Sequence, residues 1–225
     1  MLAEDEPVLV VAPHPDDEVL GCGGTIARLA VAGVTVHVAI VTTGRLPRFH
    51  EDGVARVRTE AERAHSLLGV AEAHFLDLPA AELDGIAHAD LNEAVGGLVN
   101  RVRPGTIFLP FVGDIHLDHQ LVFRSAMVAA RPKAEYYPRR LLAYETLSET
   151  NWSAPYLDPA FQPNLYFDIT ATIERKIAAF ECFESQCRSF PDERSPEALR
   201  ALAMLRGATV HRQAAEAFVV LREVV

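Results

Sequence analysis

The sequence predicts an α/β protein: a three-layer α/β/α sandwich on a mostly parallel sheet. Short apolar runs that suit buried strands alternate with segments of helical periodicity over residues 8–110. Ala, Val and Leu dominate and aromatic residues make up only 8% of the chain, which is typical of helices packed on a parallel sheet. With 225 residues, 49% of them hydrophobic, the chain can bury a large core, and we expect a single domain over residues 1–225.

The first half of the chain reads as four strands alternating with helices. We expect strands over Val8–Ala12, Val34–Thr42, Ala73–Leu76 and Thr106–Pro110, and helices over Val54–Leu68 and Ala89–Arg101. A polar loop over Pro13–Asp17 should precede a further helix that runs to about Ala32. Gly69 suits a helix C-cap and Pro104-Gly105 a turn. This alternation predicts a doubly wound sheet with helices on both faces.

The second half adds two strands, three helices and one long loop. We expect helices over Asp118–Arg131, Ala171–Glu184 and Pro196–Arg206, strands over Leu141–Thr146 and Leu165–Ile169, and a loop over Leu147–Asn164. A loop of that length in a compact domain is more often functional than idle, which makes Trp152 a residue of interest.

Composition excludes several classes of partner. The net charge of −10 and the lack of a basic run do not suit nucleic acid or an anionic membrane. Cys22, Cys182 and Cys187 form an odd count without a CxxC pair, so we expect free thiols in a reducing compartment. Met1–Pro7 lacks the features of a signal peptide and no apolar stretch approaches the ~20 residues of a membrane span. These observations predict a cytoplasmic protein, and a homo-oligomer stays open.

The first motif whose side chains could bind a metal or act in catalysis is Pro13–Glu18, directly after the first strand. In an open parallel sheet, ligands bind outside the carboxyl ends of the strands. A histidine and three consecutive acids are poor core material there. A solvated helix start would explain Asp16–Glu18, but not His14 between two prolines.

The second motif, Asp114–His119, follows the fourth strand and enters a helix. Its two histidines and two aspartates are a composition typical of metal ligands. Because both motifs leave strands at the same edge of the sheet, we expect them to converge.

Convergence of these residue types indicates metal-assisted hydrolysis. A catalytic zinc takes about three ligands from His, Asp or Glu and lowers the pKa of a bound water to ~7. An amide also needs a base for the water proton and an acid for the departing amine. Adjacent Asp16 and Asp17 point in different directions, so one can bind the ion while the other faces the water. Two histidines and a carboxylate also suit a non-haem iron oxygenase. Outside enzymes, the alternative is a metal- or sugar-binding protein that has lost catalytic activity.

The run Gly21–Gly24 invites comparison with nucleotide-binding loops. It is not GxGxxG, and no Lys-Ser/Thr pair follows as in a P-loop. Small residues that let a helix pack closely on the sheet are a sufficient explanation.

The motifs resemble those of a known family. The pair His14–Glu18 and Gly21–Thr25 is similar to the signature of the zinc-dependent deacetylases called LmbE-like or PIG-L, and the resemblance continues at His116–His119. Weaker similarity follows at Lys176, Ser185-Gln186, Arg206-Gly207 and Ala215–Phe218, so it spans nearly the whole chain. The resemblance implies a Rossmann-like sandwich and an N-deacetylase.

Carried over by position, the resemblance implies that His14, Asp17 and His119 bind zinc. Asp16 would then be the general base. His116 would steady the oxyanion or protonate the leaving amine, with Asp118 orienting it. Zn²⁺ is the expected cofactor, and Fe²⁺ or another divalent ion in the cell stays open.

Substrate contacts are predicted less directly. Arg45 and Arg58 flank the loop after the second strand and could hold a phosphate, a carboxylate or sugar hydroxyls. Trp152 could cover a sugar face, and Glu216 could line the site. The family often has Tyr before its final Ala-Glu, where this chain has Ala214, so a substrate contact at that position is in doubt.

The sequence therefore predicts a zinc-dependent hydrolase that removes an N-acetyl or similar N-acyl group from a small amino-sugar substrate. Acetyl, formyl and carbamoyl groups all stay open, and so does the pathway.

Overall fold

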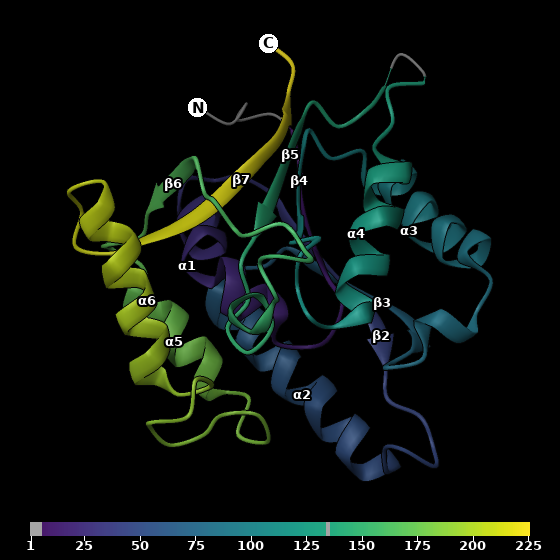
Figure 1. Cartoon of the computed structure of the whole chain (residues 1–225), viewed down its shortest axis with the longest axis horizontal. Coiled ribbons are helices and arrows are strands. Elements are labelled where there is room, and N and C mark those ends of the chain that lie inside the picture. The colour runs from purple at the N-terminus through teal and green to yellow at the C-terminus, as the bar shows by residue number, and fades with distance from the viewer. Residues whose placement is uncertain (1–5, 134–135) are drawn as a thin grey trace.

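The computed structural model, which describes residues 6–133 and 136–225, has one seven-stranded sheet between two layers of helices (Figure 1). The strand order is β3-β2-β1-β4-β5-β7-β6. The first five strands in this order are parallel, and β7 runs antiparallel to both β5 and β6. The predicted fold class, an α/β/α sandwich with a mostly parallel sheet, is confirmed.

The strands are β1 (Val8–Ala12), β2 (Val36–Thr43), β3 (Glu72–Pro79), β4 (Thr106–Pro110), β5 (Arg140–Tyr144), β6 (Leu165–Asp168) and β7 (Ala215–Glu223). The α-helices are α1 (Asp17–Val31), α2 (Glu51–Leu68), α3 (His88–Val102), α4 (Leu117–Ala129), α5 (Ile173–Glu181) and α6 (Pro196–Thr209). Two short 3₁₀ helices are η1 (Leu83–Gly85) and η2 (Thr150–Trp152).

Every predicted helix and strand is present; β1 and β4 have the predicted bounds, and the ends of the other elements are shifted. α2 begins at Glu51, three residues before the predicted start at Val54, and ends at Leu68, where Gly69 with a φ of 82° forms the C-cap. Strand β7 was not predicted. It is inserted between β5 and β6, so it depends on pairing with residues distant in the sequence.

The sheet separates two hydrophobic cores. Val8 and Val10 of β1 face the core under α1, α2, α5 and α6, while Leu9 and Val11 face the core under α3 and α4. Because successive strand residues point to opposite faces, a strand buried on both sides must be apolar throughout. This explains the continuous apolar run of β1.

The glycine-rich turn of α1 serves close packing, as the sequence indicated. A Cβ on Gly21 would overlap the ring of Tyr144, whose hydroxyl donates to the Val11 carbonyl at 2.9 Å. A Cβ on Gly24 would lie 2.7 Å from Ile169 Cδ1. Glycine at these positions lets α1 lie directly on β5 and on the end of β6.

The predictions on cysteines and on membrane spans can be compared with the structure. The three cysteines are free, as expected. Over residues 6–133 and 136–225, no helix has the length and apolar character needed to cross a membrane. Residues Met1–Asp5, part of the segment from which a signal peptide was judged absent, lie outside the described residues.

The connections place a crevice at the centre of the sheet. The chain leaves β1 towards β2 on one side and leaves its neighbour β4 towards β5 on the other. At such a switch point the loops after the two strands diverge and leave a binding crevice at their carboxyl ends. The two polar motifs follow these two strands.

Candidate metal centre and active site

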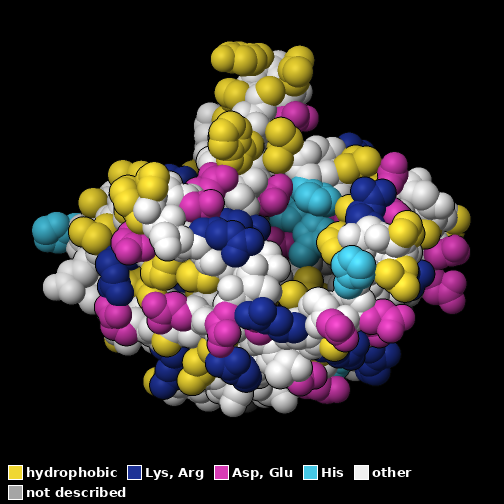
Figure 2. All heavy atoms as spheres, turned by 90° about the horizontal axis from the view of Figure 1, so that it is seen from below, with side chains coloured by type: hydrophobic (Ala, Val, Ile, Leu, Met, Phe, Trp, Pro, Cys, Tyr) yellow, Lys and Arg dark blue, Asp and Glu magenta, His cyan; other side chains and the backbone are white. Residues whose placement is uncertain are grey.

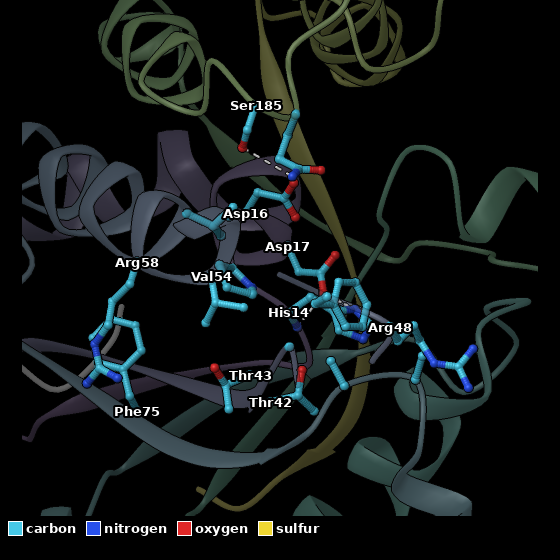
Figure 3. Close-up of a pocket in the computed structure, with 18 of the residues that line it drawn as sticks. His14, Asp16, Asp17, Thr42, Thr43, Arg48, Val54, Arg58, Phe75 and Ser185 are labelled. Carbon is cyan, nitrogen blue, oxygen red and sulfur yellow. Dashed lines mark hydrogen bonds and ion pairs between the residues drawn. The ribbon is translucent and has the colours of Figure 1, made fainter. Parts of the chain in front are cut away.

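The loop after β1 presents His14, Asp16 and Asp17 to the crevice, as Figure 3 shows. Asp16 is the N-cap of α1 and has a left-handed backbone, with φ 107°. This conformation is unfavourable for a residue other than glycine and persists only where its surroundings hold it. Glu18 supplies one restraint, because its Oε2 accepts a hydrogen bond from the Asp16 amide at 3.1 Å.

The segment after β4 supplies Asp114 and His116 from a loop and His119 from the first turn of α4, and Asp114 and His119 are buried. His116 is the N-cap of α4, and its Nδ1 accepts a hydrogen bond from the Asp118 amide at 3.1 Å. With Nδ1 as an acceptor, neutral His116 carries its proton on Nε2. His116 also lines the cleft.

Three side chains converge on one point. His14 Nδ1 lies 3.3 Å and His119 Nε2 lies 3.1 Å from the same oxygen, Oδ2 of Asp17. His119 Nε2 is fully buried yet makes no hydrogen bond of acceptable geometry within the described part of the chain. Two imidazole nitrogens and one carboxylate oxygen are donors that zinc and similar divalent ions prefer. The donor set and the unpaired nitrogen fit a metal ion held by the three residues proposed from sequence.

Aspartates hold the other nitrogen of each candidate ligand. His119 Nδ1 lies 2.9 Å from Asp114 Oδ2, and Thr150 donates to the other oxygen of Asp114 at 2.6 Å. His14 Nε2 lies 3.0 Å from Asp118 Oδ2. Such carboxylate–histidine contacts orient the ring and raise its basicity towards a metal.

The contacts of Asp118 correct one prediction. Asp118 was expected to orient His116, but its carboxylate contacts His14 and accepts from the Ala81 amide at 2.7 Å. The hydrogen bond from Asp118 to His116 comes from its backbone amide. Asp118 comes two residues after His116, the N-cap of α4. At this spacing its backbone amide, and not its carboxylate, points to the His116 side chain.

The candidate ligands bind protons strongly in the absence of a metal. Burial disfavours the charged form of His14, but hydrogen bonds to Asp118 and Asp17 outweigh it and raise its pKa to about 9. Burial also opposes the charged form of His119, yet the charge of Asp17 and the hydrogen bond to Asp114 raise its pKa to about 10. The surroundings of His14 and His119 therefore favour a positive charge beside Asp17.

Asp16 lies beside the candidate ligands and pairs with a residue that the sequence did not reveal. The guanidinium of Arg194, from the loop before α6, forms an ion pair with Asp16 Oδ2. Burial raises the pKa of Asp16 to about 7, although the charge of Arg194 opposes the rise. A carboxylate with a pKa near 7 can both accept and return a proton at neutral pH.

Glu149 is a second cleft residue that sequence reasoning did not single out. It belongs to the loop Leu147–Asn164, which also supplies Thr150 to Asp114. Burial raises the pKa of Glu149 to about 7, against the opposing charge of His119. The positions of Glu149 in the cleft and of Thr150 beside Asp114 are consistent with a functional loop. No sequence motif marked Glu149 or Thr150.

These residues line a cleft of about 560 Å³. Figure 2 shows this face of the molecule, with histidine side chains in a hollow beside acidic and basic ones. Away from the candidate centre, the lining includes an apolar wall of Val54, Val57 and Phe75 beside polar side chains such as Arg48 and His50. The guanidinium of Arg58 lies over the Phe75 ring at 3.9 Å (Figure 3). The same side chain pairs with Asp77 at 3.2 Å.

Of the four predicted substrate contacts, the structure brings only Arg58 to the cleft. Arg45 lies outside the cleft lining and donates to the carbonyl of Asp77. Trp152 is 63% exposed and donates to Glu193 at 2.6 Å, so its ring does not cover the cleft.

Glu216 has a structural role in place of the predicted substrate contact. Its carboxylate is buried and accepts hydrogen bonds from the amides of Gly24 and Thr25, at 2.9 and 2.6 Å. It also pairs with buried Lys176 at 2.5 Å. These contacts tie β7 to α1 and α5 and leave the carboxylate no access to the cleft.

Fold and site together define a class: a doubly wound α/β protein with a candidate two-histidine, one-aspartate metal centre flanked by a second aspartate and histidine. The family model described as PIG-L, GlcNAc-PI de-N-acetylase, matches residues 9–130, which contain both motifs. The chain belongs to this family, as the sequence motifs indicated.

Known relatives cover most of the chain. The uncharacterized deacetylase YaiS of Escherichia coli K12 is 31% identical over 149 residues, 63% of this chain and 74% of YaiS. The diacetylchitobiose deacetylase of Thermococcus kodakarensis is 29% identical over 201 residues, 83% of this chain and 71% of that enzyme. The conserved protein TT1542 of Thermus thermophilus has a crystal structure that superposes with a TM-score of 0.79 at 27% identity, over 98% of this chain and 96% of that one.

Proposed function

We propose that this protein is a zinc-dependent N-deacetylase that hydrolyses the N-acetyl group of an amino sugar or amino-sugar conjugate. The observation that carries the proposal is the convergence of His14 Nδ1 and His119 Nε2 on one oxygen of Asp17, with Asp16 and His116 lining the same cleft. Its relatives support the substrate class, since one of them is a diacetylchitobiose deacetylase.

His14, Asp17 and His119 would hold the ion. A bound divalent ion polarises a carbonyl oxygen and makes hydroxide available from water near neutral pH. Asp114 and Asp118 fix the orientation of the two imidazoles through their second nitrogens. Zinc suits this mixed nitrogen and oxygen set, and iron(II) is the alternative ion.

Asp16 acts as the base. Its carboxylate takes a proton from the attacking water while the water oxygen forms a bond to the amide carbon. The same carboxyl, with a pKa near 7, then returns the proton to the nitrogen as the C–N bond breaks. The products are the free amine and acetate.

His116 steadies the oxygen of the tetrahedral intermediate. Its Nδ1 accepts from the Asp118 amide, so the neutral ring offers an Nε2–H donor to the developing oxyanion. Burial, together with the charge of His14, lowers the pKa of His116 and favours this neutral form. The geometry therefore supports oxyanion stabilisation over proton donation for this residue.

The proposal is tested by free-amine release from a panel of N-acetyl amino sugars and their glycosides. Zinc-loaded wild type and Asp16→Asn are compared side by side, with oxygen uptake followed in parallel. Amine release by wild type alone, without oxygen uptake, supports hydrolysis. Oxygen uptake coupled to turnover would instead support the iron-oxygenase alternative, and binding without turnover across the panel would favour a retired binding protein.

A further inference from the structure

A second group of metal-ligating side chains lies at the opposite end of the sheet from the cleft. His37 is the second residue of β2, and Glu72 and His74 lie at the start of β3. In the parallel register His37 is opposite Glu72, and His74 is opposite Ala39, two residues further along. All three side chains therefore share the face of the sheet that α3 and α4 cover.

The two imidazoles face each other across the strands. His37 Nδ1 lies 3.0 Å from His74 Nε2, and the ring planes are inclined by only 12°. Glu72 Oε2 lies 3.8 Å from His37 Nδ1, the nitrogen that faces His74. Glu72 Oε1 lies 3.6 Å from His74 Nδ1, the nitrogen of that ring that points away from His37. One donor atom from each residue lies within 4.8 Å of the other two.

These distances are close to those of a metal site. Two nitrogens bonded to a tetrahedral zinc at 2.0–2.1 Å lie about 3.4 Å apart. The two imidazole nitrogens need to separate by only a few tenths of an ångström to reach that spacing. Glu72 is the adjustable member, because its side chain is 63% exposed while those of His37 and His74 are mostly buried.

The surroundings favour neutral imidazoles that can bind a cation. Burial lowers the pKa of His37 and of His74, with Glu72 opposing the shift in both cases. Fewer protons then compete for the two nitrogens near pH 7. The charge of Arg101 also acts on His74 and disfavours any cation nearby, so the Glu72 carboxylate is needed for balance.

We propose that His37, Glu72 and His74 form a second divalent-metal site, suited to zinc or another ion that prefers imidazole, which links edge strand β3 to β2. The site shares no ligand with the candidate centre. His37 and Thr42, which lines the cleft, are five residues apart on β2, or about 16 Å at about 3.3 Å per residue. The proposal therefore does not depend on the deacetylase function.

The test counts zinc bound to chelator-stripped protein after gel filtration. Wild type is expected to bind two zinc ions per chain, and the double variant His37→Gln/His74→Gln one. Asp17→Asn/His119→Gln, which removes two ligands of the candidate centre, is expected to retain the second ion. His88→Gln, on an exposed histidine of α3, is the matched control and should bind two.

Glu72→Gln tests the site even if the double variant misfolds, because it changes an exposed side chain and leaves both imidazoles in place. It is expected to weaken the second zinc at least about 10-fold in a calorimetric titration. Zinc should also raise the thermal midpoint less in the double variant than in wild type. One zinc per wild-type chain at saturation, or two in the double variant with unchanged affinity, would overturn the proposal.

Discussion

Arg194 forms an ion pair with Asp16, the carboxylate assigned as the base, although the two residues are 178 positions apart in the chain. The loop between α5 and α6 carries Arg194 over the crevice, where its side chain is largely buried. The guanidinium holds the carboxylate in place and opposes the rise in its pKa that burial causes. Removing it should change the pH dependence of the reaction, not only its rate.

We expect Arg194→Ala to move the acidic limb of the kcat/KM profile to higher pH. Without the guanidinium the pKa of Asp16 rises further above about 7, so less of the base is deprotonated at pH 6.5. The loss of activity should be larger at pH 6.5 than at pH 8.5, and Arg194→Lys should shift the limb less. Parallel profiles with equal loss at every pH would rule out this electrostatic role.

Asp16→Asn should lower kcat at least about 100-fold, which is the usual contribution of a general base. The substitution keeps the size of the side chain and leaves the three candidate metal ligands in place. Zinc content should therefore equal that of wild type, as measured by elemental analysis. Asp90→Asn, on an exposed position of α3, is the matched control. Near-full activity of Asp16→Asn would refute the assignment of the base.

Asp114→Asn should weaken zinc binding by about 10- to 100-fold, because it removes the carboxylate that orients His119 through Nδ1. Asparagine can still accept the Thr150 hydroxyl, so the loop contact survives. Competition with a chromophoric chelator measures the affinity. Unchanged affinity would mean that the carboxylate does not support the ligand.

Zinc binding to the stripped protein should release about two protons at pH 7. His14 and His119, with pKa values of about 9 and about 10, are protonated without the ion and must be neutral to bind it. Affinity should therefore fall as the pH is lowered. Calorimetry in buffers of different ionisation enthalpy gives the number of protons. Release of none would contradict the contacts that raise these two pKa values.

The apolar wall predicts a preference for substrates with a hydrophobic group beyond the amino sugar. The cleft of about 560 Å³ extends from the candidate centre to Phe75, which packs under Arg58. Phe75→Ala should raise KM for aryl glycosides of N-acetylglucosamine more than for the free sugar, with kcat little changed. Equal effects on both substrates would place the aryl group elsewhere.

Features set by contacts between residues close in the sequence could be predicted, and features set by distant contacts could not. Val8–Ala12 and Thr106–Pro110 were predicted with their observed bounds because a strand buried on both faces leaves a continuous apolar run. The motifs at His14–Asp17 and Asp114–His119 could be placed together because both follow parallel strands that end at one edge of the sheet.

The remaining features depend on tertiary contacts. Strand β7 is set by antiparallel pairing on both sides, and Arg194 and Glu149 come from loops whose paths no local pattern specifies. Glu216 looked like a functional acid, but it satisfies two amides of α1 and the charge of Lys176. A buried carboxylate with a structural task cannot be told from a catalytic one by residue type.

Metal-dependent hydrolysis is tested by amine release from an N-acetylglucosamine conjugate by protein stripped of metal and then given zinc. We expect no release from the stripped protein and recovery on zinc addition in wild type, but not in His119→Gln, which loses a candidate ligand. Undiminished release from the stripped protein, or full recovery in His119→Gln, would show that hydrolysis does not depend on a metal held by His119.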